Sequence, residues 1–284
     1  MKLLDGKKLS EKILKHVKLR VNALKKKRIY PCLAIVQVGN HPSSTLYVSK
    51  KLEAAEFTGI KTKKIHFPES ISKKKFLSAI DKLNKDKSVH GILIQLPLPK
   101  KLNSQIHNLM EIVLPKKDVD GFHPFNQGKN LLNENSLVAC TPKGVMRLLN
   151  EYKIDLQGKK CVMVGSSNIV GKPLAMLLLN SNATVTICNI YTKNLKEFTS
   201  KADLIAVATG VPHLIKSNMV KKGVIIVDIG TTKIKGKLLG DVDFNNVKKK
   251  ASFITPVPGG VGPMTVASLM ENTVLAAEMQ SKRK

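Results

Sequence analysis

Short apolar runs alternate with longer amphipathic segments through the second half of this chain. Four runs have the length and β-branched character of buried strands: Cys161–Val164, Thr184–Cys188, Asp203–Ala208 and Val224–Asp228. Segments long enough to form helices separate the first three runs. This order predicts a doubly wound parallel sheet with helices on its faces.

The first third of the chain has a second α/β pattern. Apolar residues at helical spacing predict an amphipathic helix over Ser10–Lys27: Leu9, Ile13, Val17, Val21 and Leu24. Strands are expected at Cys32–Val38, Lys63–Phe67 and Gly91–Leu96. One helix, capped by Ser43 or Ser44, is expected to run to about Phe57 with Gly59 just past its end, and another to cover Lys73–Asn84. The fold class is therefore α/β, with two domains and an active-site cleft between them.

The composition bounds the class of protein. A chain of 284 residues with 43% apolar residues can form two modest hydrophobic cores. The sequence has no apolar run of membrane-spanning length and no signal peptide, so we expect a cytoplasmic protein without a membrane partner. Cys32, Cys140, Cys161 and Cys188 lack a C-x-x-C spacing and are expected to be buried free thiols.

The net charge of +28 raises the question of nucleic-acid binding. It comes from 48 Lys and Arg against 20 Asp and Glu, but only four of the basic residues are arginines and aromatic residues make up 4%. Dedicated nucleic-acid binders concentrate their charge, favour arginine and interleave aromatics. We therefore expect a lysine-rich solvated surface that attracts anionic small molecules, and no specific nucleic acid.

The segment KCVMVGSSNIVGKP, Lys160 to Pro173, predicts an anion site. Its strand stops at Gly165, and Ser166, Ser167 and Asn168 can cap a helix that starts near Ile169. The first N–H groups of such a helix have no internal partners, so they can bind a pyrophosphate. The spacing is G-x5-G and not G-x-G-x-x-G, so an ordinary βα turn is the alternative.

The residues that follow the later predicted strands indicate whether the nucleotide is NADP or NAD. The segment after Cys188 has no Asp or Glu to hold a ribose, whereas Ser166, Thr192 or Lys193 could donate to a 2′-phosphate, which favours NADP with NAD still possible. Small residues in Ala208-Thr209-Gly210 and Asp228-Ile229-Gly230 leave room for a nucleotide to cross.

Candidate catalytic groups lie in the first third. Tyr47 and Lys51 are four residues apart on one helix face, where the lysine could transfer protons only if its pKa is lowered. The alternative is a packed tyrosine beside a solvated lysine. Gln95 ends a strand that prolines terminate, which is where open α/β sheets hold ligand groups. This Y-x-x-x-K precedes the anion turn, unlike that of the short-chain dehydrogenases.

Three further segments complete the candidate site. Asp118 and Asp120 form a polar turn that could bind a donor-rich ring, and two carboxylates are too few for us to expect a metal. Thr141 and Pro142 are expected to start a helix over Lys143–Tyr152. Residues 255–265 are expected to form a rigid loop that walls the cleft and leads into a helix over Val266–Gln280.

Six segments together resemble the bifunctional methylenetetrahydrofolate dehydrogenase/methenyltetrahydrofolate cyclohydrolase family, in its order and spacing: YVSKK, GILIQLPLP, KDVDGFHP, CTPKG, VGSSNIVGKP and TPVPGGVGPMT. The resemblance covers essentially the whole chain. It implies a folate-binding catalytic domain at 1–140, completed by a C-terminal helix at 266–284, and a Rossmann-like NADP-binding domain at 141–265. It also implies a homodimer.

The resemblance implies two reactions and their residues. Methylenetetrahydrofolate is oxidised with NADP, and water then opens methenyltetrahydrofolate to 10-formyltetrahydrofolate. Lys51 would be the general acid or base, Gln95 would tune it, Tyr47 would stack on the folate and Asp120 would bind the pterin's donor edge. Further substrate contacts are expected from Ser44, Pro258, Gly259 and Gly260. Cofactor contacts are expected from Gly165, Ser166, Ser167, Ile169, Thr192, Lys193, Thr209, Gly210, Ile229 and Thr265.

Two departures and two alternatives accompany this interpretation. Ile190 stands where some bacterial members carry an arginine for the 2′-phosphate, and Ala139 replaces a common proline. One alternative is a monofunctional dehydrogenase. Measuring the methenyl-folate absorbance with and without cofactor would distinguish it from a bifunctional enzyme. The other is a basic nucleic-acid-binding protein, which a salt titration of DNA binding would separate.

Overall fold

The computed structural model describes residues 1–103, 110–234 and 236–281, and these form two compact units. The small-sheet unit comprises residues 11–129, 135–140 and the C-terminal part from Val266 onward. The large-sheet unit comprises residues 1–10, 130–134 and 141–265. The short segments at 1–10 and 130–134 thus belong with the large sheet of the second half of the chain and not with the small sheet of the first third.

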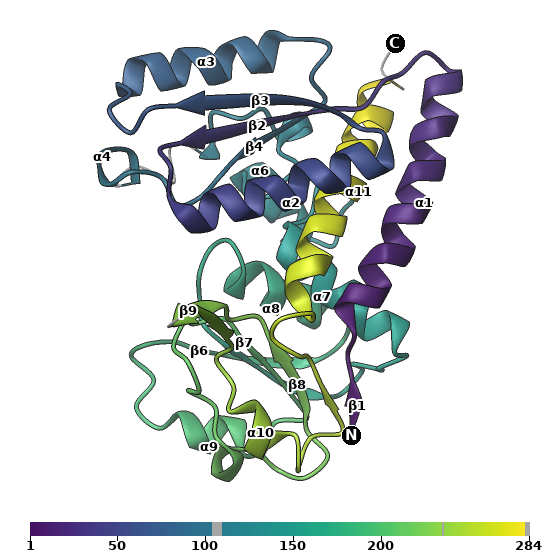
Figure 1. Ribbon diagram of the computed structural model, residues 1–284. Helices are drawn as coiled ribbons and strands as arrows, with labels where there is room; N and C mark the ends of the chain where they lie inside the picture. Colours follow the sequence, from purple (N-terminus) through teal and green to yellow (C-terminus); the bar gives the residue numbers. More distant parts are fainter. Residues whose placement is uncertain (104–109, 235, 282–284) are drawn as a thin grey trace. The chain divides into compact units, whose positions relative to one another are not determined.

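Three parallel strands form the small sheet, in the order β3-β2-β4: β2 is Cys32–Val38, β3 is Lys61–Phe67 and β4 is Gly91–Ile94. Helix α2 (Pro42–Thr58) and helix α3 (Lys73–Lys85) cover its opposite faces (Figure 1). All seven residues of β2 are buried because both faces are covered, which explains why six of the seven are apolar. Phe76, Ile80 and Leu83 of α3 complete one side of this core.

Two long helices and three short ones complete the described small-sheet elements and their connections. Helix α1 is Gly6–Lys26 and helix α11 is Val261–Ser281. Arg20 on α1 binds Glu278 on α11 with two hydrogen bonds, at 3.2 and 2.7 Å. The short helices are α4 (Lys100–Asn103), η1 (Pro115–Lys117) and α6 (Pro124–Leu131).

The large sheet has six strands that are all paired in parallel, in the order β1-β11-β8-β7-β5-β6. Their bounds are Lys2–Leu3 (β1), Lys160–Val164 (β5), Thr184–Cys188 (β6), Leu204–Val207 (β7), Ile225–Asp228 (β8) and Phe253–Ile254 (β11). Since β5 lies between β6 and β7, the strand order reverses there, and ligands bind at the carboxyl ends of strands that flank such a point.

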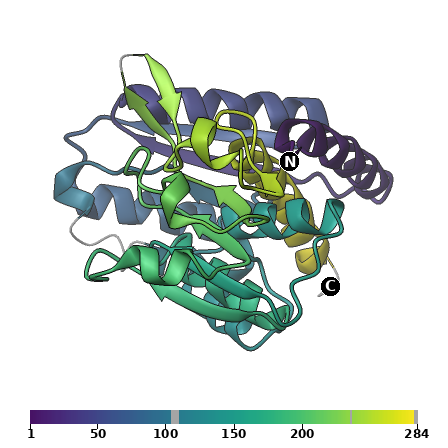
Figure 2. The same ribbon diagram turned by 90° about the horizontal axis from the view of Figure 1, so that it is seen from below.

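Helices and a hairpin surround this sheet. The helices are α7 (Cys140–Glu151), α8 (Gly171–Asn180), α9 (Leu195–Thr199), η2 (Ser217–Met219) and α10 (Phe244–Val247). Strands β9 (Thr232–Ile234) and β10 (Lys237–Leu239) form a separate antiparallel hairpin (Figure 2). The α/β fold class expected from the sequence is confirmed.

Four predicted helix starts were wrong by two to five residues. Helix α2 begins at Pro42 and not after a cap at Ser43 or Ser44, α7 begins at Cys140 and α11 at Val261. Pro42, Pro142 and Pro263 each lie in a first helical turn, where the missing proline N–H has no intrahelical partner to lose. Helix α8 begins at Gly171 and not near Ile169, because residues 168–170 form a turn.

Other expectations concern small groups of residues. All four cysteines are buried and free, as predicted. Within the described ranges, no three His, Cys, Asp or Glu side chains gather as a metal site would require. No helix among the described elements combines the length and apolar character needed to cross a bilayer. Of the predicted C-terminal helix, residues 282–284 lie outside the described residues.

Candidate active site

Lys51 and Gln95 meet in the small-sheet unit. The Nζ of Lys51 on α2 donates a 2.9 Å hydrogen bond to the Oε1 of Gln95, and the two residues are 9% and 8% exposed. Gln95 directly follows β4, and its N–H donates to the carbonyl of Val36 at 2.8 Å. This backbone bond fixes Gln95 at the carboxyl end of the sheet, as its position before two prolines predicted.

Burial gives Lys51 its chemical character. Desolvation lowers the pKa of the Lys51 amine, and the nearby charge of Asp120 opposes the shift. A buried lysine with a lowered pKa can accept as well as donate a proton near neutral pH. The alternative of an ordinary solvated lysine at position 51 is therefore wrong.

The two carboxylates of the 118–120 turn have different surroundings. Asp118 is buried and accepts hydrogen bonds from the N–H groups of Gly121, Phe122 and His123, at 3.1, 3.1 and 2.9 Å. A fourth bond comes from the Nδ2 of Asn126 at 2.9 Å. Asp118 is thus saturated by its own loop, which leaves Asp120 as the carboxylate that faces Lys51.

Asp120 is partly exposed and electrostatically coupled to Lys51. Desolvation raises the pKa of Asp120 to about 6, while the charge of Lys51 opposes the shift. The carboxylate therefore remains mostly ionised at neutral pH and can accept hydrogen bonds from a ligand. Lys51, Gln95 and Asp120 are the candidate catalytic residues, and we call them the catalytic cluster for short.

Tyr47 and Ser44 lie on the N-terminal half of the same helix. Tyr47 is half-buried one helical turn before Lys51, so both side chains leave one face of α2. Ser44 is 3% exposed, and its hydroxyl donates to the carbonyl of Leu96 at 3.3 Å. Ser44 thus ties α2 to the segment that carries Gln95, whereas its predicted role as the helix cap was wrong.

In the large-sheet unit, two glycines shape the turn between β5 and α8. Gly165 has a φ of +115°, and a Cβ at this position would collide with the carbonyl oxygen of Ala208. A Cβ at Gly171 would collide with the carbonyl oxygen of Gly165. The Oγ of Ser167 accepts hydrogen bonds from the N–H groups of Val170 and Gly171, at 3.2 and 3.3 Å. A turn with close-packed glycines at both ends, at a strand-order reversal and followed by a helix N-terminus, fits a diphosphate.

The Thr209-Gly210 turn after β7 depends on Asp241, a residue that sequence reasoning missed. The Oδ2 of Asp241 accepts bonds from the Thr209 N–H, the Thr209 hydroxyl and the Gly210 N–H, at 2.6, 2.9 and 3.0 Å. Its Oδ1 is buried without a hydrogen-bond partner among the described residues. Gly230 is the trace that this contact leaves in the sequence. It lies beside Asp241 in the fold, and a Cβ at Gly230 would collide with the Asp241 carboxylate.

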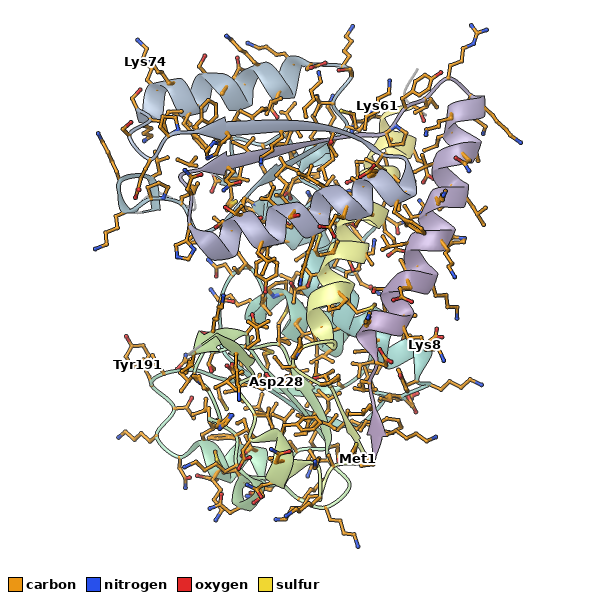
Figure 3. The ribbon with its side chains drawn as sticks, viewed as in Figure 1. Met1, Lys8, Lys61, Lys74, Tyr191 and Asp228 are labelled. Atoms are coloured by element: carbon orange, nitrogen blue, oxygen red, sulfur yellow. The ribbon has the colours of Figure 1, made fainter. Side chains whose placement is uncertain are left out.

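Asp228 holds the backbone of Asp241 in place through a hydrogen bond. The Asp228 carboxylate accepts bonds from the N–H groups of Gly230, Asp241 and Val242, at 3.1, 3.0 and 3.0 Å. Figure 3 shows Asp228 within its unit, and the residue is 3% exposed. Desolvation raises the pKa of Asp228 to about 7, which makes it a buried acid that titrates near neutrality. Ile229, an expected cofactor contact, lies between Asp228 and Gly230.

The turn after β6 presents exposed side chains and no carboxylate. Ile190 and Tyr191 are 92% and 87% exposed, and Tyr191 points outward in Figure 3. The Oγ1 of Thr192 accepts a 2.9 Å bond from the Asn189 N–H, which shapes the turn, and Lys193 is exposed beside it. Ser166 is partly exposed at the β5 turn.

The predicted 255–265 loop is a loop only in its first half, because α11 begins at Val261. The carbonyl of Gly259 accepts a 2.9 Å bond from the Lys7 N–H, and the Gly260 N–H donates to Pro256 at 2.9 Å. Pro258 between them is exposed. Thr265 lies inside the helix, and its hydroxyl bonds to that of Thr141 at 3.0 Å.

Two family models match successive parts of the chain. Residues 4–120 match the catalytic domain of tetrahydrofolate dehydrogenase/cyclohydrolase, and residues 139–281 match its NAD(P)-binding domain. The chain belongs to the tetrahydrofolate dehydrogenase/cyclohydrolase family. The catalytic-domain match includes all three residues of the catalytic cluster, and the NAD(P)-binding match includes the turns after β5, β6 and β7.

Full-length relatives are similar to this chain throughout. The bifunctional protein FolD of Nitratiruptor is 52% identical over 283 residues, which cover 99% of this chain and all of the relative. The crystal structure of FolD from Campylobacter jejuni has a TM-score of 0.96 at 51% identity and covers 98% of this chain and 99% of its own. The Trypanosoma brucei enzyme, described as complexed with NADP cofactor and inhibitor, has a TM-score of 0.93 at 33% identity, with 99% and 98% covered.

Proposed function

We propose that this chain performs both reactions of its family in one shared site. It oxidises 5,10-methylenetetrahydrofolate to 5,10-methenyltetrahydrofolate with NADP, and it hydrolyses the methenyl compound to 10-formyltetrahydrofolate. Family membership supports the pair of reactions. The single observation that carries the hydrolysis is the buried Lys51 amine, with its lowered pKa and its fixed neutral acceptor, Gln95.

Lys51 acts as the proton-transfer group of the hydrolysis. As water adds to the methenyl carbon, a C–O bond forms and the neutral amine of Lys51 accepts a proton from that water. The added hydroxyl then loses its proton and becomes the formyl C=O as the bond from this carbon to N5 of the folate breaks. N5 takes up one proton, and the proton held by Lys51 is the net proton released. A general acid or base works best when its pKa lies near the working pH, and burial moves Lys51 in that direction.

Gln95 positions the amine without adding charge. Because its Oε1 occupies one N–H of Lys51, the remaining amine valences are directed away from Gln95. An amide acceptor holds the lysine while leaving its pKa low, whereas a carboxylate at the same place would raise that pKa. The contact therefore orients the amine, and burial sets its low proton affinity.

Asp120, Tyr47 and Ser44 bind the folate. Asp120 accepts hydrogen bonds from the donor edge of the pterin, for which a partly exposed and mostly ionised carboxylate is suited. The ring of Tyr47 offers a stacking face one turn from Lys51. Ser44 stabilises the approach of α2 to the Gln95 segment. Pro258, Gly259 and Gly260 supply a backbone-rich contact on the nucleotide-binding domain.

NADP binds to the large-sheet unit, which serves as the nucleotide-binding domain at 141–265. The bound nucleotide supplies the hydride acceptor. The Gly165 turn with Ser166, Ser167 and Ile169 holds its diphosphate, while Thr209, Gly210, Ile229 and Thr265 form the floor and side of the site. Asp241 fixes the Thr209-Gly210 backbone through three hydrogen bonds, so these two residues present a preorganised surface.

The 2′-phosphate lies at the turn after β6. Ser166, Thr192 and Lys193 can donate to it, and no carboxylate in the 189–193 turn repels it. NAD is the second cofactor that this site accepts, because Ile190 offers neither a donor nor a charge.

The assembly and location follow the family resemblance. We expect a homodimer in the cytoplasm, formed through the nucleotide-binding domains. Light scattering coupled to size-exclusion chromatography tests the dimer, since a monomer at micromolar concentration contradicts it.

A two-part spectrophotometric assay tests the function. With methylenetetrahydrofolate and NADP, the purified protein should produce reduced nucleotide and then formyltetrahydrofolate. With methenyltetrahydrofolate alone, the methenyl absorbance should decay faster than without protein. Reduction of NADP without faster decay would leave a monofunctional dehydrogenase, and absence of both activities would contradict the proposal.

A further inference from the structure

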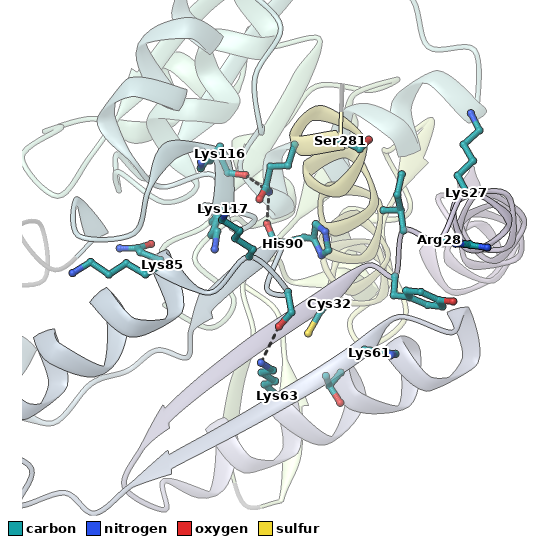
Figure 4. Close-up of a pocket in the computed structure, with 17 residues that line it drawn as sticks. Lys27, Arg28, Cys32, Lys61, Lys63, Lys85, His90, Lys116, Lys117 and Ser281 are labelled. Carbon is teal, nitrogen blue, oxygen red and sulfur yellow. Dashed lines mark hydrogen bonds between the residues drawn. The ribbon is translucent and has the colours of Figure 1, made fainter. Parts of the chain in front are cut away.

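A second concave site lies in the small-sheet unit, away from the catalytic cluster. It is a cavity of about 1020 Å³ at the amino ends of β2 and β3, where Cys32 and Lys61 begin these strands (Figure 4). The residues of the catalytic cluster do not line it, and Gln95 follows the carboxyl end of the same sheet. We call this cavity the basic cavity.

Positively charged residues line the basic cavity from four segments. Lys27 and Arg28 follow α1, and Lys61 and Lys63 lie on β3. Figure 4 labels these four residues among those that line the cavity, with Lys61 and Lys63 nearer Cys32 than Lys27 and Arg28.

The other two segments contribute four more lysines. Lys85 and Lys87 surround the end of α3, and Lys116 and Lys117 come from η1. The described lining thus carries eight lysines and arginines, and it includes no aspartate or glutamate. A low-dielectric concave surface with one sign of charge concentrates ions of the opposite sign.

Part of this charge is offset locally. Lys63 pairs with Asp86 at 2.6 Å and Lys85 with Asp81 at 2.7 Å. The ends of α1, α3 and α11 reach the lining, and each helix C-terminus acts as roughly half a negative charge. These groups offset about half of the eight positive charges, so a net positive cavity remains.

Three exposed lysines account for much of the remaining positive charge of the basic cavity. Lys27, Lys87 and Lys116 are exposed and make no ion pair within the described part of the chain. They come from three separate segments that the fold brings to one cavity. The sequence reading of the lysines as a dispersed solvated surface did not anticipate this convergence.

The floor of the basic cavity holds two buried nitrogen groups. Lys117 is 2% exposed, and its Nζ donates to the carbonyls of Leu83 and Asp86 at 2.9 and 2.7 Å. The Nδ1 of His90 is buried without a hydrogen-bond partner among the described residues. Burial lowers the pKa of His90, and the charge of Lys117 lowers it further. An anion in the cavity would stabilise the charged imidazolium and oppose both effects.

We propose that the basic cavity binds a compact multivalent oxyanion, either an oligophosphate or a small polycarboxylate. The cavity volume matches the range of about 300–1,000 Å³ typical of small-molecule sites. The lining contains one arginine and one aromatic residue, Tyr30, which gives little stacking surface for nucleic-acid bases. A small ligand with several negative charges therefore fits better than a nucleic-acid strand.

Calorimetric titration of the full chain with inorganic tripolyphosphate tests the proposal. Saturating NADP is included so that the turn after Gly165 is filled, and the salt is held at about 0.15 M to screen dispersed charges. The cavity variant is Lys27→Gln/Lys87→Gln/Lys116→Gln. The matched control, Lys74→Gln/Lys75→Gln/Lys222→Gln, removes three exposed lysines that do not line the cavity.

Binding should weaken at least tenfold in the cavity variant and change less than twofold in the control. Citrate, titrated in parallel, separates the two sources: tighter tripolyphosphate binding identifies a phosphate ligand, and tighter citrate binding identifies a carboxylate ligand. NMR should show the imidazole of His90 titrating at higher pH when tripolyphosphate is bound. Circular dichroism checks that both variants are folded.

Three results would overturn the proposal. The first is no binding to the wild type, and the second is equal weakening in both variants, which indicates unspecific charge. The third is a DNA duplex that displaces tripolyphosphate with a steep salt dependence through the same three lysines. None of these results bears on folate turnover, because the basic cavity contains no residue of the catalytic cluster.

Discussion

The amine of Lys51 donates its 2.9 Å hydrogen bond to a neutral amide, that of Gln95, although a carboxylate of similar size could occupy the same place. The neutral partner matters because burial lowers the lysine pKa, and a negative partner would cancel this effect. The contact therefore sets the direction of the amine, and its neutrality leaves in place the lowered pKa that burial produces.

Gln95→Glu should move the pH profile of methenyl-folate hydrolysis. The new carboxylate would raise the pKa of Lys51, so the alkaline rise in rate should shift upward by at least about one pH unit. Gln95→Met, which removes the acceptor without adding charge, is the control and should lower the rate without that upward shift. A profile of Gln95→Glu that overlays the wild type would show that Gln95 does not tune the lysine.

Much of the fold could be predicted from the sequence, since strands and helix existence follow from local patterns. The bounds of β2 and β6 agree with the prediction because each run is rich in β-branched or apolar residues and is followed by residues typical of turns. Helix starts were harder to predict, because prolines that appear to precede a helix lie inside its first turn.

In the candidate site, too, some residues could be predicted from local sequence patterns and others could not. Lys51 and Gln95 could be chosen from spacing and from strand ends, but the distinction between Asp118 and Asp120 needed the loop, where four donors saturate Asp118. The contact of Asp241 with the Thr209-Gly210 turn joins residues 31 and 32 apart in sequence. Such long-range contacts leave no local pattern to read.

Gly165→Ala should impair nucleotide binding and stability together. The substitution combines a strained φ of +115° with a collision against the carbonyl of Ala208, so we expect a loss of about 1–3 kcal/mol in unfolding free energy. NADP affinity should fall at least tenfold. Gly158→Ala is the control, because its φ is +70° and no atom lies within 4 Å of the added Cβ. Equal nucleotide affinity in the two variants would contradict the assignment of the Gly165 turn.

The buried carboxyl of Asp228 should make stability fall as the pH rises. Its pKa is about 7 in the folded protein against about 3.9 when unfolded. The folded state therefore holds the proton more tightly, and the contribution of Asp228 is complete below about pH 4 and is lost as the pH rises to about 7. Denaturant unfolding of the wild type and of Asp228→Asn between about pH 4 and pH 7 measures this contribution to the unfolding free energy. The stability difference should change by up to about 4 kcal/mol, and a flat difference would refute the high pKa.

Ile190→Arg should increase the preference for NADP. Position 190 is 92% exposed at the turn after β6, so an arginine can reach a 2′-phosphate without disturbing the core. We expect the NADP/NAD ratio of kcat/KM to rise about tenfold, in line with one charge-assisted hydrogen bond. Ile190→Glu should lower the same ratio. If both variants keep the wild-type ratio, the 2′-phosphate does not lie at this turn.

The rate of methenyl-folate hydrolysis by Lys51→Met, measured beside Lys50→Met, tests the central claim most directly. Lys50 is the exposed neighbour in the sequence and serves as the matched control. Loss of a positioned general acid or base typically costs 10²–10⁴-fold. Lys51→Met should therefore hydrolyse methenyltetrahydrofolate at least about a hundredfold more slowly while binding NADP normally, and Lys50→Met should match the wild type. Hydrolysis by Lys51→Met at the wild-type rate would contradict the account.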